Sequence, residues 1–207
     1  MDSSDSDTSS NSETTISTSS ASSSTTLYGK VRTTSEMIID KSIKARFHAS
    51  YRHQEFSLPD SIMHYMAMNP KNAKVYQKLI QSCKYFFVKN PILVISSLQY
   101  DSKRWAGDWK YINLNNISSK LWITGYVDFN PRNAEDKSVT SNISQIYQCD
   151  ATMLNITNLN IYYDELIIFD SNVDCLDLRY VTVKYENSTN VQFEKIIQLF
   201  PKLIFLD

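Results

Sequence analysis

The sequence predicts a mixed α/β fold, with α+β as the alternative, in which a short helical pair caps an irregular stack of strands and helices. Three observations support this prediction. The first 26 residues contain 18 Ser or Thr and almost no apolar side chains. Residues 58–87 carry apolar side chains at helical spacing on both sides of an Asn-Pro break. From Ile92 onward, short apolar runs alternate with amphipathic segments, which is typical of strand–helix units.

The bulk composition fits one compact domain with a tail. The chain has 207 residues, of which 42% are hydrophobic, and its formal net charge is -1. This charge argues against general binding to nucleic acid or to anionic membranes. Neither a secretory leader nor an apolar run of about 18 residues is present, so we expect an intracellular protein, cytoplasmic or nuclear, with no membrane partner.

Two polar segments precede the first predicted helix. Residues 1–26 should be disordered, because they cannot bury enough apolar surface to offset the entropy of ordering. Residues 27–56 hold six Lys or Arg among scattered apolar side chains, which predicts a linker with transient helicity.

Residues 57–90 form the predicted helical module. Ser57 is a suitable N-cap for the first helix, and Asn69-Pro70 ends this helix because a residue before proline avoids helical angles. Asn72 can cap a second helix with apolar residues at helical spacing. The second helix is expected to leave through Tyr85–Phe87 into a strand.

Residues 91–207 form the predicted α/β region. Apolar, β-branched runs predict strands, and the expected ones are Ile92–Ile95, Tyr111–Leu114, Leu121–Val127, Met153–Ile156 and Leu203–Leu206. Amphipathic spacing predicts a brief helix around Ile143–Tyr147 and longer ones over Tyr162–Phe169 and Val191–Phe200.

A weak repeat runs through this region. Pairs of apolar residues recur at Leu121/Ile123, Leu154/Ile156, Leu176/Leu178 and Leu206, at offsets of 33, 22 and 30 residues. These offsets lie near the leucine-rich-repeat range of about 20–29 residues. The two alternatives are a degenerate repeat stack and an ordinary α/β domain with apolar strands.

The sequence predicts no enzyme, no cofactor and no metal site. Three glycines cannot form a glycine-rich phosphate loop, and the three histidines lie within residues 48–64, without a nucleophile motif. Asp170–Asp174 resembles half of a calcium loop but lacks the required glycine and the final glutamate. Trp105 and Trp109 lie in a predicted loop, where they either bind a target or belong to the core.

Leu58-Pro59, Asn69-Pro70 and Cys83–Phe87 occur in the order and spacing of an F-box, and the chain resembles an F-box-like family expanded in nematodes over about residues 57–207. The resemblance implies a protein-interaction protein that recognises substrates for a Skp1–cullin ubiquitin ligase. It implies docking on Skp1 through six residues: Leu58, Pro59, Ile62, Met66, Val75 and Leu79. The α/β region would bind the target. The alternative is a stand-alone protein-binding domain whose helices cap the repeat stack.

Overall fold

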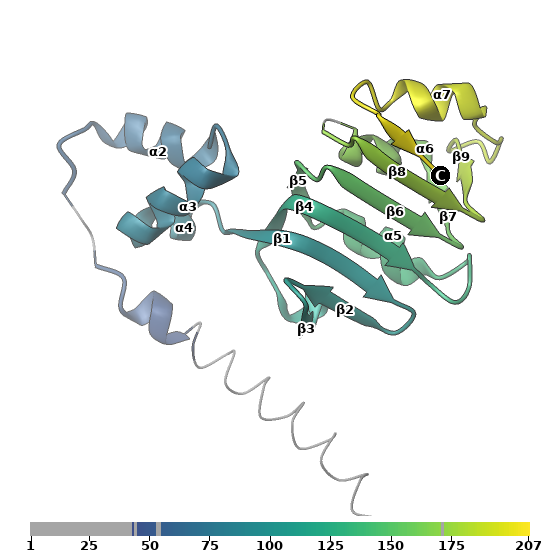
Figure 1. Ribbon diagram of the computed structural model, residues 1–207. Coiled ribbons are helices and arrows are strands. Elements are labelled where there is room, and N and C mark those ends of the chain that lie inside the picture. Colours follow the sequence, from purple (N-terminus) through teal and green to yellow (C-terminus); the bar gives the residue numbers. More distant parts are fainter. Residues whose placement is uncertain (1–42, 44, 53–54, 171) are drawn as a thin grey trace, which may run out of the picture. The chain divides into compact units, whose positions relative to one another are not determined.

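The computed structural model describes residues 43, 45–52, 55–170 and 172–207 (Figure 1). The predicted tail over residues 1–26 lies outside the described residues, as does most of the predicted linker over residues 27–56. The chain divides into two units at residue 45, and the described residues from 46 to 207 belong to the second. All helices and strands named below belong to the second unit.

The helical module contains three helices rather than the predicted pair: α2 (Asp60–Met68), α3 (Ala73–Ser82) and α4 (Lys84–Lys89). Helix α2 begins after Pro59, so the expected N-cap at Ser57 is wrong. The cap at Asn72 is confirmed, because its side chain accepts a 2.9 Å hydrogen bond from the Val75 amide. The predicted aromatic exit is helix α4, whose aromatic and β-branched residues gave no helical signal in the sequence.

The fold is mixed α/β and is built on one eight-stranded sheet. Five strands lie side by side in chain order and run parallel: β1 (Ile92–Asp101), β4 (Lys120–Asn130), β6 (Met153–Thr157), β8 (Cys175–Arg179) and β10 (Phe205–Leu206). The hairpin of β2 (Arg104–Gly107) and β3 (Lys110–Ile112) extends the β1 edge, and β5 (Ile146–Cys149) pairs with the start of β4. A parallel order that follows the chain is the arrangement expected of stacked strand–helix repeats.

The register of these strands differs from the predicted repeat at one position. Apolar residues align across the sheet in one row, formed by Leu98, Val127, Leu154, Leu176 and Leu206. Val127 therefore takes the place expected for Leu121, and the offsets along the chain become 29, 27, 22 and 30 residues. Leu121 pairs instead with Ile146 of β5.

An irregularity in β4 is the physical reason for this difference. The pairing with β1 shifts between Ile95 and Ser97, opposite Gly125. A Cβ atom on Gly125 would lie 2.9 Å from the Ser96 carbonyl oxygen, so the close approach of the two backbones requires glycine here.

The segments between the strands carry short helices and a second, two-stranded parallel sheet. These elements are η1 (Leu114–Asn116), α5 (Lys137–Ile143), β7 (Asn160–Tyr162), α6 (Tyr163–Leu166), η2 (Ile167–Phe169), β9 (Thr182–Lys184) and α7 (Phe193–Gln198). In Figure 1, α5 and α6 lie on one face of the large sheet. The predicted helix over Tyr162–Phe169 is confirmed as α6 and η2, whereas the helix expected around Ile143–Tyr147 ends at Ile143.

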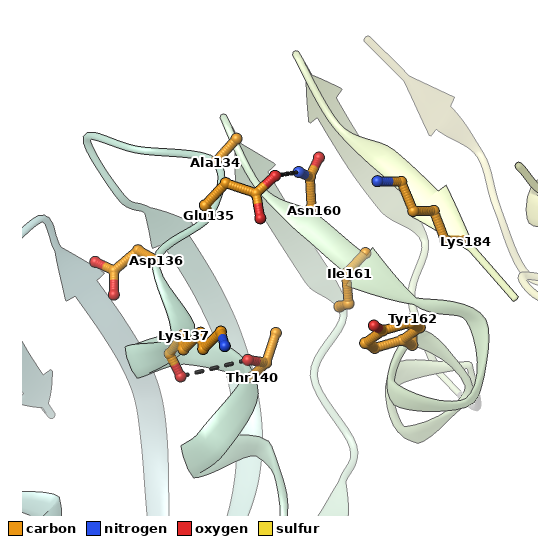
Figure 2. Close-up of a pocket in the computed structure, with 9 residues that line it drawn as sticks. All are labelled: Ala134, Glu135, Asp136, Lys137, Thr140, Asn160, Ile161, Tyr162 and Lys184. Atoms are coloured by element: carbon orange, nitrogen blue, oxygen red, sulfur yellow. Dashed lines mark hydrogen bonds between the residues drawn. The ribbon is translucent and has the colours of Figure 1, made fainter. Parts of the chain in front are cut away.

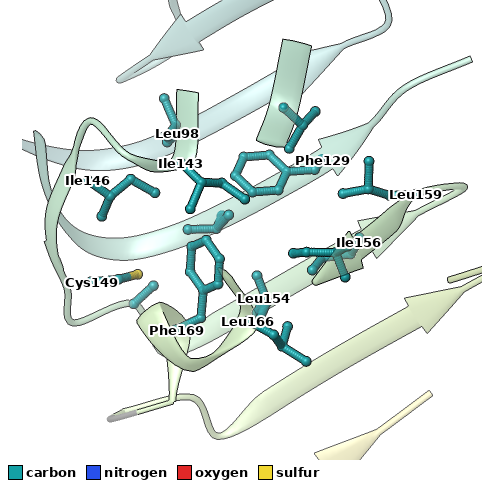
Figure 3. Packing of buried hydrophobic residues seen from close by; sticks show 14 of the residues in the cluster. Leu98, Phe129, Ile143, Ile146, Cys149, Leu154, Ile156, Leu159, Leu166 and Phe169 are labelled. Atoms are coloured by element: carbon teal, nitrogen blue, oxygen red, sulfur yellow. The ribbon is translucent and has the colours of Figure 1, made fainter. Parts of the chain in front are cut away.

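The main core lies between these helices and the sheet, as Figure 3 shows. Side chains from alternate strand positions, such as Phe129 and Leu154, meet Ile143, Leu166 and Phe169 from the connecting segments. All five are essentially fully buried. Each contributes about 1.5–3 kcal/mol of hydrophobic stabilisation, so the alternation of β4 and β6 is firmly fixed.

A smaller cluster joins helix α3 to the opposite face of the sheet. Tyr76 and Trp122 are fully buried, and their ring centroids lie 6.4 Å apart. The Tyr76 hydroxyl donates a hydrogen bond to the Asn90 carbonyl and accepts one from the Ile92 amide at 3.2 Å. One side chain therefore satisfies the backbone where α4 passes into β1.

Replacing Tyr76 with Phe should lower the free energy of unfolding by about 1–3 kcal/mol, because the Asn90 carbonyl and the Ile92 amide lose their partner. Urea denaturation of the full chain measures this loss. The exposed Tyr65 provides the matched control, and Tyr65→Phe should change stability by less than about 0.5 kcal/mol. Equal stability of the two variants would contradict the assigned role of Tyr76.

Candidate functional site

The face of the large sheet opposite the main core carries a row of polar side chains. Gln99, Asp128, Asn155 and Asp177 occupy equivalent positions on four neighbouring strands. Tyr126 lies two residues before Asp128, so it points to the same face. We call these five residues the open face. They are only partly buried, whereas Val127, Leu154 and Leu176 between them are fully buried.

The turn between β2 and β3 holds an aromatic side chain beside the open face. Gly107 pairs with Lys110, so Asp108 and Trp109 form a two-residue turn, and their φ angles are 50° and 65°. Both positive angles match the turn type favoured in hairpins, which normally takes Asn-Gly or Asp-Gly. A tryptophan in this conformation is strained, and such strain is found most often where a side chain has a function.

Hydrogen bonds to Asp108 hold this strained turn in place. Its carboxylate accepts bonds from the Ser96 amide at 2.7 Å, the Ser96 hydroxyl at 2.6 Å and the Ser97 amide at 3.1 Å. Burial alone would raise the pKa of Asp108, but these three bonds lower it below its ordinary value. The turn is therefore anchored to β1 by an ionised carboxylate.

Trp109 stacks against the open face and remains accessible. Its ring is nearly parallel to that of Tyr126, with an interplanar angle of 18° and a centroid distance of 6.5 Å. Trp109 is nevertheless 77% exposed. Further large apolar side chains are exposed at outward positions of the same sheet, namely Tyr111, Met153 and Phe205. Exposed aromatic and apolar groups gathered on one face are typical of an interaction surface.

The polar row carries negative charge. Burial and the nearby carboxylates of Asp177 and Asp101 raise the pKa of Asp128, although a hydrogen bond from the Tyr126 hydroxyl lowers it in part. Burial and the nearby carboxylate of Asp128 raise the pKa of Tyr126 to about 12. The Asn155 amide donates to the Tyr126 oxygen at 3.3 Å, so three side chains of this face form one polar network.

Asp177 lies at the other end of the row, beside an exposed arginine. One of its carboxylate oxygens forms an ion pair with Arg179 at a distance of 2.8 Å. The Arg179 guanidinium also contacts the Asp207 carboxylate at 2.7 Å. The other oxygen of Asp177 is buried and has no hydrogen-bond partner among the described residues. A buried carboxylate oxygen without a donor lowers the stability of the folded protein.

The structure separates the two tryptophans that the sequence analysis offered as target-binding residues. Trp105 lies on strand β2 rather than in a loop, and it is only 8% exposed. Its ring packs against Tyr100 and Phe129, so Trp105 belongs to the core and cannot contact a target. Trp109 remains a candidate. Asp128 and Asp177 were missed, because nothing in the sequence shows that residues 49 positions apart lie on one face.

The six predicted Skp1-docking residues also divide into two groups. Leu58, Pro59, Ile62 and Val75 are exposed on the helical module. Met66 and Leu79 pack instead against the buried cluster of Met63, Ala67 and Phe86, which holds α2 and α4 together. Both are only partly buried, so the cluster covers one side of Met66 and Leu79, and their docking role stays a prediction.

Among the hollows of the described residues, two border the α/β region outside the open face. One, of about 310 Å³, is lined by Glu135, Lys137, Asn160 and Lys184, and Glu135 accepts a 2.6 Å hydrogen bond from Asn160 (Figure 2). The hollow is lined by both acidic and basic side chains. Among the residues drawn in Figure 2, no nucleophile is paired with a base. The other, of about 440 Å³, lies between the start of α3 and Asp108 and adjoins the Trp109 turn.

Within residues 43, 45–52, 55–170 and 172–207, no group of three or more His, Cys, Asp or Glu side chains is arranged to hold a metal ion. Each helix in these same ranges is too short or too polar to span a lipid bilayer. Comparisons of the chain with protein-family models, with curated proteins and with solved structures find no match.

Replacing Asp128 with Asn should raise the melting temperature at pH 7. The pKa of Asp128 is raised in the folded protein, so the folded state binds this proton more tightly than the unfolded state. The stability that this proton contributes is present below the ordinary pKa of 3.8 and is lost as the pH rises through the folded value. The gain from Asp128→Asn should therefore shrink as the pH falls from 7 toward 3.5.

Thermal melts of both proteins across this pH range measure the effect. Glu186→Gln removes an exposed carboxylate of a turn outside the open face and serves as the matched control. A lower melting temperature for Asp128→Asn than for the parent protein at pH 7 would show that the carboxylate stabilises the fold.

Proposed function

We propose that the protein is a non-enzymatic, intracellular protein-interaction protein that acts in the cytoplasm or nucleus. Helices α2–α4 dock on a Skp1-type adaptor, and the open face binds a target for ubiquitin ligation. The observation that carries this proposal is the exposed apolar stripe of α2. It supports docking because the stripe lies apart from the residues that hold the module together.

Helix α2 is apolar on two sides. Met63 and Ala67 are buried against the rest of the module. Leu58, just before the helix, and Ile62 and Tyr65 within it follow one another at four- and three-residue steps, and they are 47%, 46% and 66% exposed. Apolar groups gathered on one side of a helix favour association with another protein. The stripe includes two of the residues that the F-box resemblance assigns to Skp1.

The third helix strengthens the resemblance. The sequence predicted only two of the three helices expected of a full F-box, whereas α4 follows α3 directly after Cys83. Three short helices in succession, the first entered through Leu58-Pro59, are what the resemblance implies. The open face would then hold the target on the α/β part of the same chain.

Ile62→Asp combined with Val75→Asp should weaken binding of the full chain to purified Skp1 at least tenfold, because both changes place charge on exposed apolar positions. A pull-down or calorimetric titration with purified components measures this. Gln81→Asp adds charge at an exposed position of α3 outside the stripe and should leave binding unchanged. If the parent protein fails to bind Skp1 at all, the adaptor role is excluded.

The packing of Tyr76 favours a second candidate function. This side chain and Trp122 bury each other, so the helices complete the sheet as well as presenting an outer surface. In that case the protein is a stand-alone protein-binding domain without a ligase link, and the three helices act as a structural cap.

Deleting residues 57–90 distinguishes the two candidates. If the helices are a cap, the deletion exposes Ile92 and Trp122 to water, and the remaining chain should lose its cooperative unfolding transition. A detachable docking module would leave that transition in place. Circular dichroism during thermal and urea denaturation gives the answer.

A further inference from the structure

We infer that a hollow beside the start of helix α4 binds an extended, acidic segment of a partner protein. The hollow has a volume of about 450 Å³ and lies between residues 47–52 and residues 80–84, where α3 passes into α4. We call it the basic hollow. It is lined neither by the open face nor by the predicted Skp1-docking residues. The inference therefore goes beyond the proposed function and does not rest on it.

The charge of the basic hollow favours an anionic partner. Arg52 and Lys84 line the hollow, whereas no Asp or Glu does. The sequence beside it is also basic, because residues 41–54 contain four Lys or Arg and no acid. Among the described residues, neither Arg52 nor Lys84 forms an ion pair. A carboxylate brought to this hollow would therefore meet two cations that have no counter-charge.

Lys84 is held at the basic hollow by contacts that leave its charge in place. Its ammonium group donates a hydrogen bond to the Ser50 hydroxyl and lies 4.9 Å from the centre of the Phe47 ring. Neither contact neutralises the ammonium group, which has three N–H donors and keeps two of them for a ligand. Because the side chain is already positioned, little further conformational entropy is lost when an anion binds.

Other side chains of the basic hollow supply further donors. The Tyr51 hydroxyl and the Gln81 amide line it together with the Arg52 guanidinium. In the part of the chain that the structure describes, none of these three groups donates a hydrogen bond to a protein acceptor. A carboxylate has about four acceptor positions on its two oxygens, so one Asp or Glu side chain can use several of these donors at once.

The packing of Phe47 favours an acidic peptide over nucleic acid. Basic grooves bind single-stranded nucleic acid chiefly where aromatic side chains stack on the bases. The Phe47 ring instead lies under the Lys84 ammonium group and meets the Phe87 ring edge-on, with the two centroids 5.5 Å apart. It also contacts His48. Phe47 therefore offers no free face for a base, and the basic hollow presents mainly donors and positive charge.

Fluorescence polarisation with the full chain tests the inference directly. The probe is the synthetic peptide fluorescein-Gly-Ser-Asp-Glu-Asp-Glu-Ser-Gly-amide. We expect saturable binding that weakens as salt is added, because the contacts are electrostatic and partly exposed to solvent. The matched control peptide has Asn in place of each Asp and Gln in place of each Glu, and it should not bind.

Variants of the full chain assign the contacts. Arg52→Gln together with Lys84→Gln should weaken binding of the acidic probe about tenfold or more. Lys71→Gln together with Lys78→Gln removes the same charge from exposed positions of the helical module outside the basic hollow, and it should change binding less than about twofold.

A single substitution separates a lost contact from damaged packing. Lys84 also contacts Ser50 and Phe47, so its replacement affects the packing of residues 47–52 as well as the charge. Arg52 is exposed and has no ion pair among the described residues. Arg52→Gln alone should therefore weaken binding of the probe about threefold or more while the melting temperature stays unchanged.

Four outcomes would overturn the inference. The variant with both Gln substitutions in the basic hollow could bind the probe as tightly as the parent protein, or the uncharged peptide could bind as well as the acidic one. Polyuridylate could displace the probe at lower concentration than the unlabelled acidic peptide does, which would assign the hollow to nucleic acid. A synthetic peptide of residues 1–14 of this chain, which contains four acids and no Lys or Arg, could compete more strongly than the unlabelled probe, and the partner would then be replaced by the chain's own sequence.

Discussion

The aligned row of buried apolar residues across β1, β4, β6 and β8 is the constraint on which the rest of the α/β region depends. Leu98, Val127, Leu154 and Leu176 occupy equivalent positions on the four strands, and all are buried. Because side chains alternate along a strand, this inner row forces the neighbouring residues outward. The polar row that includes Asp128 and Asp177 is therefore a geometric consequence of the core. A one-residue slip of any of these strands would turn its apolar residue outward and its polar residue inward, so it would break both the apolar row and the polar row.

The irregularity at Gly125 divides the outer face of β4 into two parts with different roles. Before it, Trp122 points outward and is buried by Tyr76 of α3. After it, Tyr126 and Asp128 point outward and remain partly exposed. The first part uses its apolar surface to attach the helical module. The second part stays partly accessible to solvent, so the two halves of one strand have different surroundings.

The sequence predicted the parts of the fold that local patterns determine. The strands around Ile92–Ile95 and Met153–Ile156 and the cap at Asn72 follow from alternation and capping, and each is confirmed. Helix α4 was missed because its aromatic residues also suit a strand. The open face could not be predicted, because it depends on the register between distant strands. Trp109 was a candidate from its residue type, but its accessibility depends on two positive φ angles that no local rule assigns to tryptophan.

The two candidate surfaces of the chain differ in chemistry, and this difference limits how each can work. The α2 stripe is apolar, so its contacts should depend on buried area and change little with salt. The open face combines carboxylates with aromatic rings, so its contacts should weaken as ionic strength rises. A partner suited to one surface is therefore a poor ligand for the other. In the proposed adaptor role, two partners would therefore not compete for one surface.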